Sequence, residues 1–227
     1  PGTDSKILPK DYICYQDAAA MIVTARHLAI FTGAGISTPS GIPDFRSSNK
    51  GLWTREDPML VASRSVFLRN PERFYNWYRP LLKAASSASP NPAHTAIAKL
   101  ERIGILKAVV TQNIDGLHQA AGSKKVVELH GTMQAYNCLQ CGLVAENHSR
   151  LTDKVLAGDL PRCTSCDAIL KPAITLFEEA LPIEAWNTAL SEISLADVLV
   201  IAGSSLEVQP ASTLPWSAVR RGCKLIM

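Results

Sequence analysis

Short apolar runs alternate with amphipathic stretches along this chain. Apolar runs bounded by glycine or polar residues predict buried strands at residues 28–32, 106–111, 125–129, 198–202 and from 224 onward. Apolar side chains that recur at helical spacing predict helices at residues 17–26, 92–102, 116–121, 184–196 and 210–221. Strands that alternate with helices in this way favour a parallel sheet with helices on both faces. The predicted fold class is therefore α/β.

Two segments interrupt this alternation. Residues 47–90 contain one predicted helix, at residues 71–83, but no strand pattern, and residues 133–171 contain two pairs of cysteines. We expect both segments to be inserts that together form a small lobe. The remaining segments form the large domain, at residues 1–46, 91–132 and 172–227. The apolar run that ends at Met227 reads as an interrupted strand, which suggests a truncated C-terminus.

Composition narrows the class of protein. Hydrophobic residues make up 47% and charged residues 19% of the 227 residues, which is ordinary for a globular protein and excludes a disordered chain. We expect no secretory leader, because no charged-then-apolar stretch opens the sequence, and no apolar run reaches about 18 residues. The net charge of +3 is too small to indicate a nucleic-acid partner. We therefore expect a soluble cytoplasmic protein that binds no membrane.

Four of the six cysteines carry a metal-binding pattern. They form two Cys-x2-Cys pairs separated by residues 142–162, at Cys138, Cys141, Cys163 and Cys166. This spacing is typical of a zinc ion held by four thiolates, and redox-active or unligated cysteines are the alternative. Four thiolates leave no open position for water, so the predicted zinc is structural. Dispersed basic residues and no interleaved aromatic residues argue against direct nucleic-acid binding by this module.

Three predicted strands end in turns that could bind a nucleotide. The first is followed by Gly33-Ala34-Gly35-Ile36-Ser37, where glycines would let the backbone approach a pyrophosphate. Thr38 stands where the usual dinucleotide motif has its third glycine, so a generic tight turn stays open. The other two turns offer hydroxyl and amide groups suited to a ribose or a carboxamide, Gln112-Asn113-Ile114-Asp115 and Gly203-Ser204-Ser205. Capped turns without a ligand are the alternative for both.

One histidine is a candidate general base. His130 follows a predicted strand and precedes Gly131, a position that keeps its ring accessible. An imidazole with a pKa near ~6.5 suits proton removal at neutral pH. The other four histidines are interpreted as structural or merely exposed: His27, His94, His118 and His148.

In this order, the motifs resemble the sirtuin family. The matching segments also include Gly41-Ile42-Pro43-Asp44-Phe45-Arg46 and Leu129-His130-Gly131. The sequence as a whole is most similar to the prokaryotic branch of the family. The resemblance implies a Rossmann-type large domain, a zinc-ribbon and helical small lobe, and an NAD-dependent protein-lysine deacylase. It implies NAD as co-substrate, bound by Gly33, Ala34, Gly35, Ser37, Thr38, Phe45, Arg46, Gln112, Asn113, Ile114, Asp115, Gly203, Ser204 and Ser205.

The resemblance also implies a reaction and its partners. The acyl oxygen of a substrate lysine attacks the nicotinamide ribose, and nicotinamide leaves. His130 then removes a proton from the ribose hydroxyls, so that the 2′-oxygen attacks the imidate carbon, while Asn113 and Gln112 orient ribose and water. The products are free lysine, nicotinamide and 2′-O-acyl-ADP-ribose, and the partners are acyl-lysine proteins or peptides. Mono-ADP-ribosyl transfer and an inactive NAD-binding scaffold are the alternatives.

Two positions bear on substrate choice. The family pairs the substrate peptide with a strand that corresponds here to Thr175, Leu176, Phe177 and Glu178. Glu178 stands where the family usually has glycine, which suggests altered peptide affinity and a preference for basic flanking residues. Family members that favour acidic acyl groups carry a tyrosine and, three residues later, an arginine. After Tyr75 this chain has Tyr78 at that spacing, followed by Arg79, so we expect neutral acyl groups.

Overall fold

The computed structural model describes residues 14–44, 57–145 and 148–227, and its centre is a five-stranded parallel sheet. The strand order is β3-β2-β1-β7-β8. These strands are β1 (Leu28–Thr32), β2 (Leu106–Thr111), β3 (Val126–Glu128), β7 (Val198–Ala202) and β8 (Lys224–Ile226). The α/β fold predicted from the sequence is confirmed.

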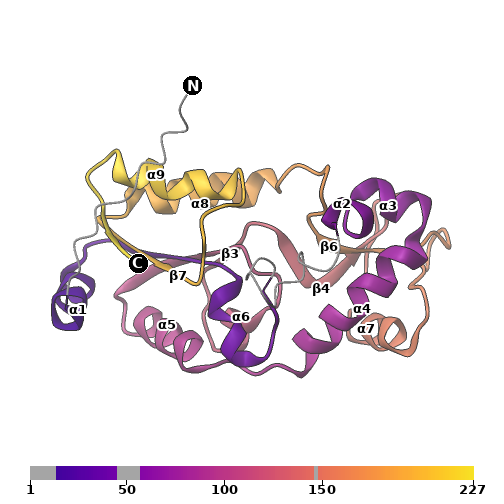
Figure 1. Cartoon of the computed structure of the whole chain (residues 1–227), viewed down its shortest axis with the longest axis horizontal. Coiled ribbons are helices and arrows are strands. Elements are labelled where there is room, and N and C mark those ends of the chain that lie inside the picture. The colour runs from indigo at the N-terminus through magenta and orange to yellow at the C-terminus, as the bar shows by residue number, and fades with distance from the viewer. Residues whose placement is uncertain (1–13, 45–56, 146–147) are drawn as a thin grey trace.

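Alternate residues of the strands enter two different apolar clusters. In β1, Leu28 and Ile30 pack with helix α5, whereas Ala29 and Phe31 pack with helices α8 and α9. Figure 1 shows α8 and α9 along one face of the sheet and α5 and α6 on the other. The helices around the sheet are α1 (Tyr15–Thr24), α5 (Pro92–Arg102), α6 (Leu117–Ala120), α8 (Ile183–Leu195) and α9 (Leu214–Val219). Both faces of the sheet are therefore buried.

The last predicted helix is shorter than its periodicity indicates. Residues 210–221 contain a 3-10 turn, η4 (Ala211–Thr213), before α9 begins. Pro215 lies in the first turn of α9, where its missing amide hydrogen is tolerated. Gly222, with φ of +84°, follows the end of α9. Proline and glycine thus divide and end this segment.

A second group of helices and strands lies at one end of the five-stranded sheet (Figure 1). Its antiparallel sheet has the order β5-β4-β6, from β4 (Gly131–Asn137), β5 (Val144–Ala145) and β6 (Lys171–Ile174). Its helices are α2 (Pro58–Val61), α3 (Arg64–Arg69), α4 (Pro71–Ser87) and α7 (His148–Ala157). The sequence pattern had indicated only α4 among these elements. Strands β5 and β6 have only two and four residues, and the seven residues of β4 lack a regular alternation of burial.

The helices and the cysteine segment share one apolar core. Phe74 stacks on Tyr78 at a ring-centroid distance of 5.5 Å, and Tyr75 meets Phe74 edge-on at 5.2 Å. The same cluster contains buried residues from the cysteine segment, namely Tyr136, Cys138, Val155, Cys163 and Leu170. The two inserts are therefore packed against each other, and the exact division into large domain and small lobe stays a prediction.

Among the residues that the structure describes, no helix combines the length and the apolar character needed to cross a membrane.

Candidate functional site

The turns after β1 and β7 lie in direct contact. The Gly33 amide donates to Ala202 O (3.1 Å), and the Gly35 amide donates to Gly203 O (2.8 Å). A Cβ atom on either Gly33 or Gly35 would come within 3 Å of Gly203 O. Gly203 has φ of +66°, and a Cβ there would overlap the Ile36 amide nitrogen. These three glycines are required by turn-to-turn packing, a reason that the sequence motif does not reveal.

Side chains after β2 join all three strand ends. The Gln112 side-chain amide donates to Ser204 Oγ (2.8 Å), and the Asn113 side-chain amide donates to Gly33 O (3.2 Å) and Ser37 Oγ (3.1 Å). Ser37 in turn donates its hydroxyl hydrogen to Asp115 Oδ2 at 2.7 Å. The carboxyl ends of β1, β2 and β7 therefore form one cross-linked polar edge, where ligands bind in open α/β sheets.

Asp115 has a second role within this edge. Its Oδ1 accepts a hydrogen bond from the Leu117 amide (2.9 Å), at the start of α6. Each oxygen of the carboxylate therefore accepts one hydrogen bond within the protein. A fixed carboxylate is an acceptor suited to the NH2 group of a carboxamide.

The remaining predicted nucleotide-binding residues are more exposed. Ala34 is half-buried in η1 (Ala34–Ile36), and the Thr38 hydroxyl donates to Gly35 O (2.9 Å) in the next turn, η2 (Thr38–Ser40). Ser205 is exposed and its hydroxyl lies 3.4 Å from Glu207 Oε2. Ile114 packs against the core of the helical insert and cysteine segment. Phe45 and Arg46 lie outside the described residues.

His130 is fixed at the same edge by one ring nitrogen. Its Nδ1 lies 2.9 Å from Gln112 O, and its own carbonyl accepts the Thr175 amide at 2.8 Å. Because a carbonyl oxygen only accepts, the Nδ1 atom carries the hydrogen, and Nε2 is the basic nitrogen of the neutral ring. Gly131 has φ of +76° and no room for a side chain, because a Cβ would overlap Ala173 O. Gln112 O thus sets the tautomer of the imidazole, and the close approach of Gly131 to β6 helps to set its position.

A buried network below Asn113 was missed by sequence reasoning. The Asn113 amide donates to Thr111 Oγ1 (3.0 Å), which also accepts the Thr32 hydroxyl (2.8 Å). Thr32 Oγ1 lies 3.0 Å from His118 Nε2, and the His118 ring packs edge-on against His94 at 4.9 Å. Both histidines are buried, so they are structural, as interpreted, but they also support a candidate catalytic residue. The only sequence signal was a threonine at the end of each of two strands.

This histidine pair makes stability depend on pH. Burial lowers the pKa of His118 from 6.5 to about 4, and the neighbouring His94 adds to the shift. His94 Nε2 and His118 Nδ1 are buried and have no hydrogen-bond partner among the described residues. A proton on either ring would therefore be poorly stabilised.

We expect the free energy of unfolding to fall by about 2 kcal/mol between pH 7 and pH 5 because of His118 alone. The sign follows because the unfolded chain binds more protons than the folded chain between pH 6.5 and about 4. Urea unfolding at both pH values should show a smaller fall for His118→Asn than for the unchanged chain. His148→Asn, which alters an exposed histidine, is the control. Equal falls in the unchanged chain and His118→Asn would contradict this assignment.

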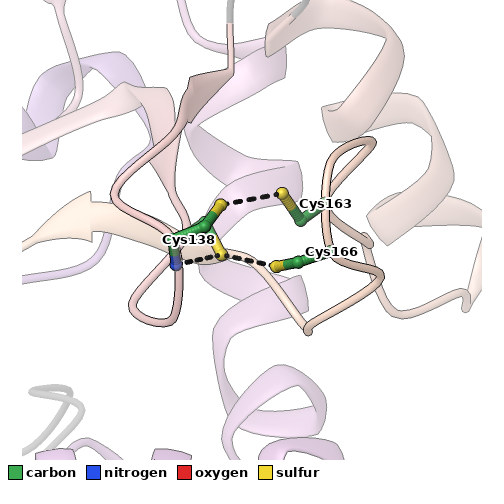
Figure 2. Close-up of side chains that lie close together, drawn as sticks. Cys138, Cys163 and Cys166 are labelled. Atoms are coloured by element: carbon green, nitrogen blue, oxygen red, sulfur yellow. Dashed lines mark hydrogen bonds between the residues drawn. The ribbon is translucent and has the colours of Figure 1, made fainter.

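The four paired cysteines form one cluster. Their sulfur atoms all lie within 4.8 Å of one another, with Cys138 Sγ 3.4 Å from Cys166 Sγ and Cys141 Sγ 3.6 Å from Cys163 Sγ. Figure 2 shows the sulfur atoms of Cys163 and Cys166 directed toward the Cys138 side. Tetrahedral zinc with Zn–S bonds of about 2.3 Å separates its sulfur atoms by about 3.8 Å. The cluster therefore fits one zinc ion, as predicted from the spacing.

Backbone amides support this cluster. The Cys141 amide donates to Cys138 Sγ (3.5 Å), and the Ser165 amide donates to Cys163 Sγ (3.4 Å). The hydrogen bond from the Cys141 amide holds the pKa of the Cys138 thiol below its usual range. Thiolates are the form that binds zinc, so this hydrogen bond favours the metal-binding form of Cys138.

The predicted substrate segment continues from β6. Leu176 is buried, whereas Phe177 is 38% exposed. Phe177 also pairs with Ser63 in an isolated parallel bridge to the start of α3. The segment thus runs between the cysteine module and the helical insert, close to His130 through the Thr175 amide.

Comparisons with known proteins place the chain in a family. It is 46% identical over 211 residues to NAD-dependent protein deacylase 2 of Archaeoglobus fulgidus, covering 92% of this chain and 82% of the relative. It is 43% identical over 202 residues to NAD-dependent protein deacetylase 2 of Caldanaerobacter subterraneus subsp. tengcongensis, covering 88% and 80%. A structure of Sir2 with a p53 peptide and NAD+ matches with a TM-score of 0.83 at 39% identity, covering 94% of this chain and 85% of that chain.

A second solved structure contains products. Sir2 with a deacetylated p53 peptide and 3′-O-acetyl ADP ribose matches with a TM-score of 0.86 at 39% identity, covering 94% of this chain and 85% of that chain. The sequence profile of the Sir2 family matches residues 33–210, which include the three cross-linked strand ends, His130 and the four cysteines. This chain is a member of the Sir2 family.

Proposed function

We propose that this chain is an NAD-dependent protein-lysine deacylase that forms nicotinamide, 2′-O-acyl-ADP-ribose and free lysine. Relatives at 40–46% identity over most of the chain are NAD-dependent protein deacylases. The observation that carries the proposal is the polar edge itself. There His130, with Nε2 as its basic nitrogen, is held by Gln112 next to Asn113.

Each polar residue of this edge has a proposed task. His130 Nε2 removes a proton from a ribose hydroxyl, and its Nδ1 hydrogen bond keeps the ring in that tautomer. Asn113 is oriented by Gly33 O and Ser37 Oγ through its NH2 group, so its Oδ1 is the atom that accepts from a ribose hydroxyl or water. Asp115 accepts a hydrogen bond from the NH2 group of the nicotinamide carboxamide.

The nucleotide itself would occupy the edge formed by the three turns. Gly33, Gly35 and Gly203 bring the β1 and β7 turns together, so phosphate and adenosine ribose would meet neighbouring backbone segments. Phe45 and Arg46 are proposed to complete this site from outside the described residues. NAD acts here as a co-substrate, whereas the zinc held by the four thiolates is structural and supplies no chemistry.

We also propose a preference for neutral acyl groups. Tyr75 and Tyr78 are fully buried, and the Tyr75 hydroxyl donates to Leu170 O at 2.5 Å. Arg79 donates to Val155 O and Gly158 O at the end of α7. The Tyr75 hydroxyl and Arg79 are engaged in holding α4 against its neighbours, and the Tyr78 ring is buried in the aromatic cluster, so none of them is positioned as a receptor for an acidic acyl chain.

Mass spectrometry of an acetyl-lysine peptide incubated with the chain and NAD tests the proposal. We expect loss of the acetyl group, with no ADP-ribose added to the peptide. Gain of ADP-ribose with the acetyl group retained would instead support the alternative activity, mono-ADP-ribosyl transfer. The cytoplasmic location and the lack of nucleic-acid binding stay predictions.

A further inference from the structure

The segment that we propose to align the substrate is already paired on one side. The Phe177 amide donates to Ala62 O (3.1 Å), and the Arg64 amide donates to Phe177 O (3.0 Å). These two hydrogen bonds tie the segment to the start of α3, more than a hundred residues earlier in the chain. Because only one residue of the segment, Phe177, is paired in this way, further contacts are needed to keep the segment ordered.

Glu178 supplies such contacts. Its Oε2 accepts the Ser65 amide and its Oε1 accepts the Ser65 hydroxyl, both at 2.9 Å. The Ser65 amide belongs to the first turn of α3, where amides lack a partner within the helix. These hydrogen bonds, with smaller effects of Arg69 and Arg64, lower the pKa of Glu178. The carboxylate of Glu178 is therefore ionised, and the Ser65 donors and the two arginines stabilise its negative charge.

The backbone at Glu178 is unusual for this residue type. Its φ is +73°, in the left-handed region that favours glycine. A non-glycine residue persists there only when its surroundings hold it. The two hydrogen bonds from Ser65 hold the Glu178 side chain against α3 while its backbone adopts this conformation.

The next residue fixes the other side of the segment. Glu179 Oε2 accepts the Leu176 amide (2.9 Å) and lies 3.0 Å from Lys171 Nζ. Lys171 is 6% exposed, and its Nζ also donates to Ile174 O at 2.6 Å. An open cleft of about 490 Å³ adjoins both glutamates and Thr175. Glu179 Oε1 also lies 3.9 Å from Arg64 Nε at the start of α3. Glu178 therefore contacts α3, whereas Glu179 contacts both β6 and α3.

We propose that Glu178 is a positioning residue whose carboxylate clamps residues 175–178 onto α3, so that the substrate-aligning strand is ordered before the peptide binds. The proposal rests on the proposed deacylase function. Preorganisation of this kind improves peptide affinity by reducing the entropy lost on binding. It also offers an alternative to a preference for basic flanking residues, because Ser65 and the arginines already compensate the charge.

The test compares Glu178→Ala, Glu178→Gln and the unchanged chain by amide hydrogen exchange and by steady-state kinetics. We expect Glu178→Ala to speed exchange of the Leu176 and Phe177 amides by about tenfold and to raise KM for an acetyl-lysine peptide by about tenfold. The kcat value and KM for NAD should change by less than about twofold. Glu178→Gln has an amide oxygen that can still accept a hydrogen bond from the Ser65 amide, so its exchange rates and KM should stay close to those of the unchanged chain.

Two controls test whether these effects come from the clamp. Glu72→Ala removes an exposed glutamate from the first turn of α4 and should leave exchange and KM unchanged. In a Ser65→Ala background, Glu178→Ala should have a smaller effect than in the unchanged chain, because the two side chains act as a pair.

The contrary outcomes are distinct. Exchange and KM that are unchanged in Glu178→Ala would overturn the clamp. So would a loss of turnover confined to peptides with basic flanking residues, which would indicate direct charge recognition. An unchanged chain that does not deacylate any acetyl-lysine peptide would overturn the proposed function, whereas the exchange measurement would still test whether Glu178 orders the segment.

Discussion

Replacement of His130 by alanine will lower the rate of lysine deacylation by about 10²- to 10⁴-fold, the usual contribution of a general base. The reason is geometric. Gln112 O holds the Nδ1 hydrogen, so the substitution removes a basic nitrogen, Nε2, that is held at the polar edge. Steady-state turnover of an acetyl-lysine peptide measures the loss.

A second readout of the same variant locates the affected step. In the proposed reaction nicotinamide leaves before His130 removes a proton, so single-turnover nicotinamide release should be reduced less than deacylation. His148→Ala, which changes an exposed histidine on α7, is the matched control and should keep full turnover. A folded His130→Ala chain with turnover within about threefold of the unchanged chain would show that His130 is not the base.

Loss of zinc will strongly destabilise the chain. Structural zinc contributes about 10–16 kcal/mol in small zinc-finger peptides. Here Cys138 and Cys163 also belong to the apolar core that contains Tyr136, Val155 and Leu170, so part of that core should persist without the metal. We therefore expect Cys141→Ser to bind less than one zinc per chain and to lower Tm by at least about 10 °C.

The control for the zinc prediction is Cys14→Ser. Cys14 is exposed and lies outside the cluster, so this substitution should change neither zinc content nor Tm. Metal analysis together with thermal unfolding checks both variants. A zinc-free Cys141→Ser chain with an unchanged Tm would contradict a structural role for the metal.

Much of the fold and the zinc site was predictable because the signals are local. The two Cys-x2-Cys pairs contain their own turns, and the strands at 28–32, 106–111 and 198–202 are short runs of mostly apolar residues. Local patterns therefore identified the sheet, its covering helices and the metal ligands. Strands β5 and β6 were missed because they have only two and four residues, and β4 was missed because its seven residues show no regular alternation of buried and exposed positions.

Other features depend on partners that are distant in sequence. Gly203 is required because the β1 turn lies against it, and no local rule identifies that neighbour. His118 reaches Asn113 only through Thr32 and Thr111, which pair in register on adjacent strands. Such long-range contacts are visible only once the sheet has been assembled.

Glu178 illustrates the same limit at the substrate segment. From the sequence it is a charged residue in place of glycine, which suggested recognition of basic peptides. Its partner Ser65 lies 113 residues away, on a helix that the sequence pattern did not indicate. The chemistry of a side chain was readable from the sequence, but the group that it contacts was not.

Deacylation is tested most simply by the number of nicotinamide molecules released per lysine deacylated, with the zinc-loaded chain, NAD and an acetyl-lysine peptide. We expect nicotinamide release to depend on the peptide, with one nicotinamide formed for each acetyl group lost. Nicotinamide release without deacylation, or release that is equal in the absence of peptide, would contradict the deacylase assignment.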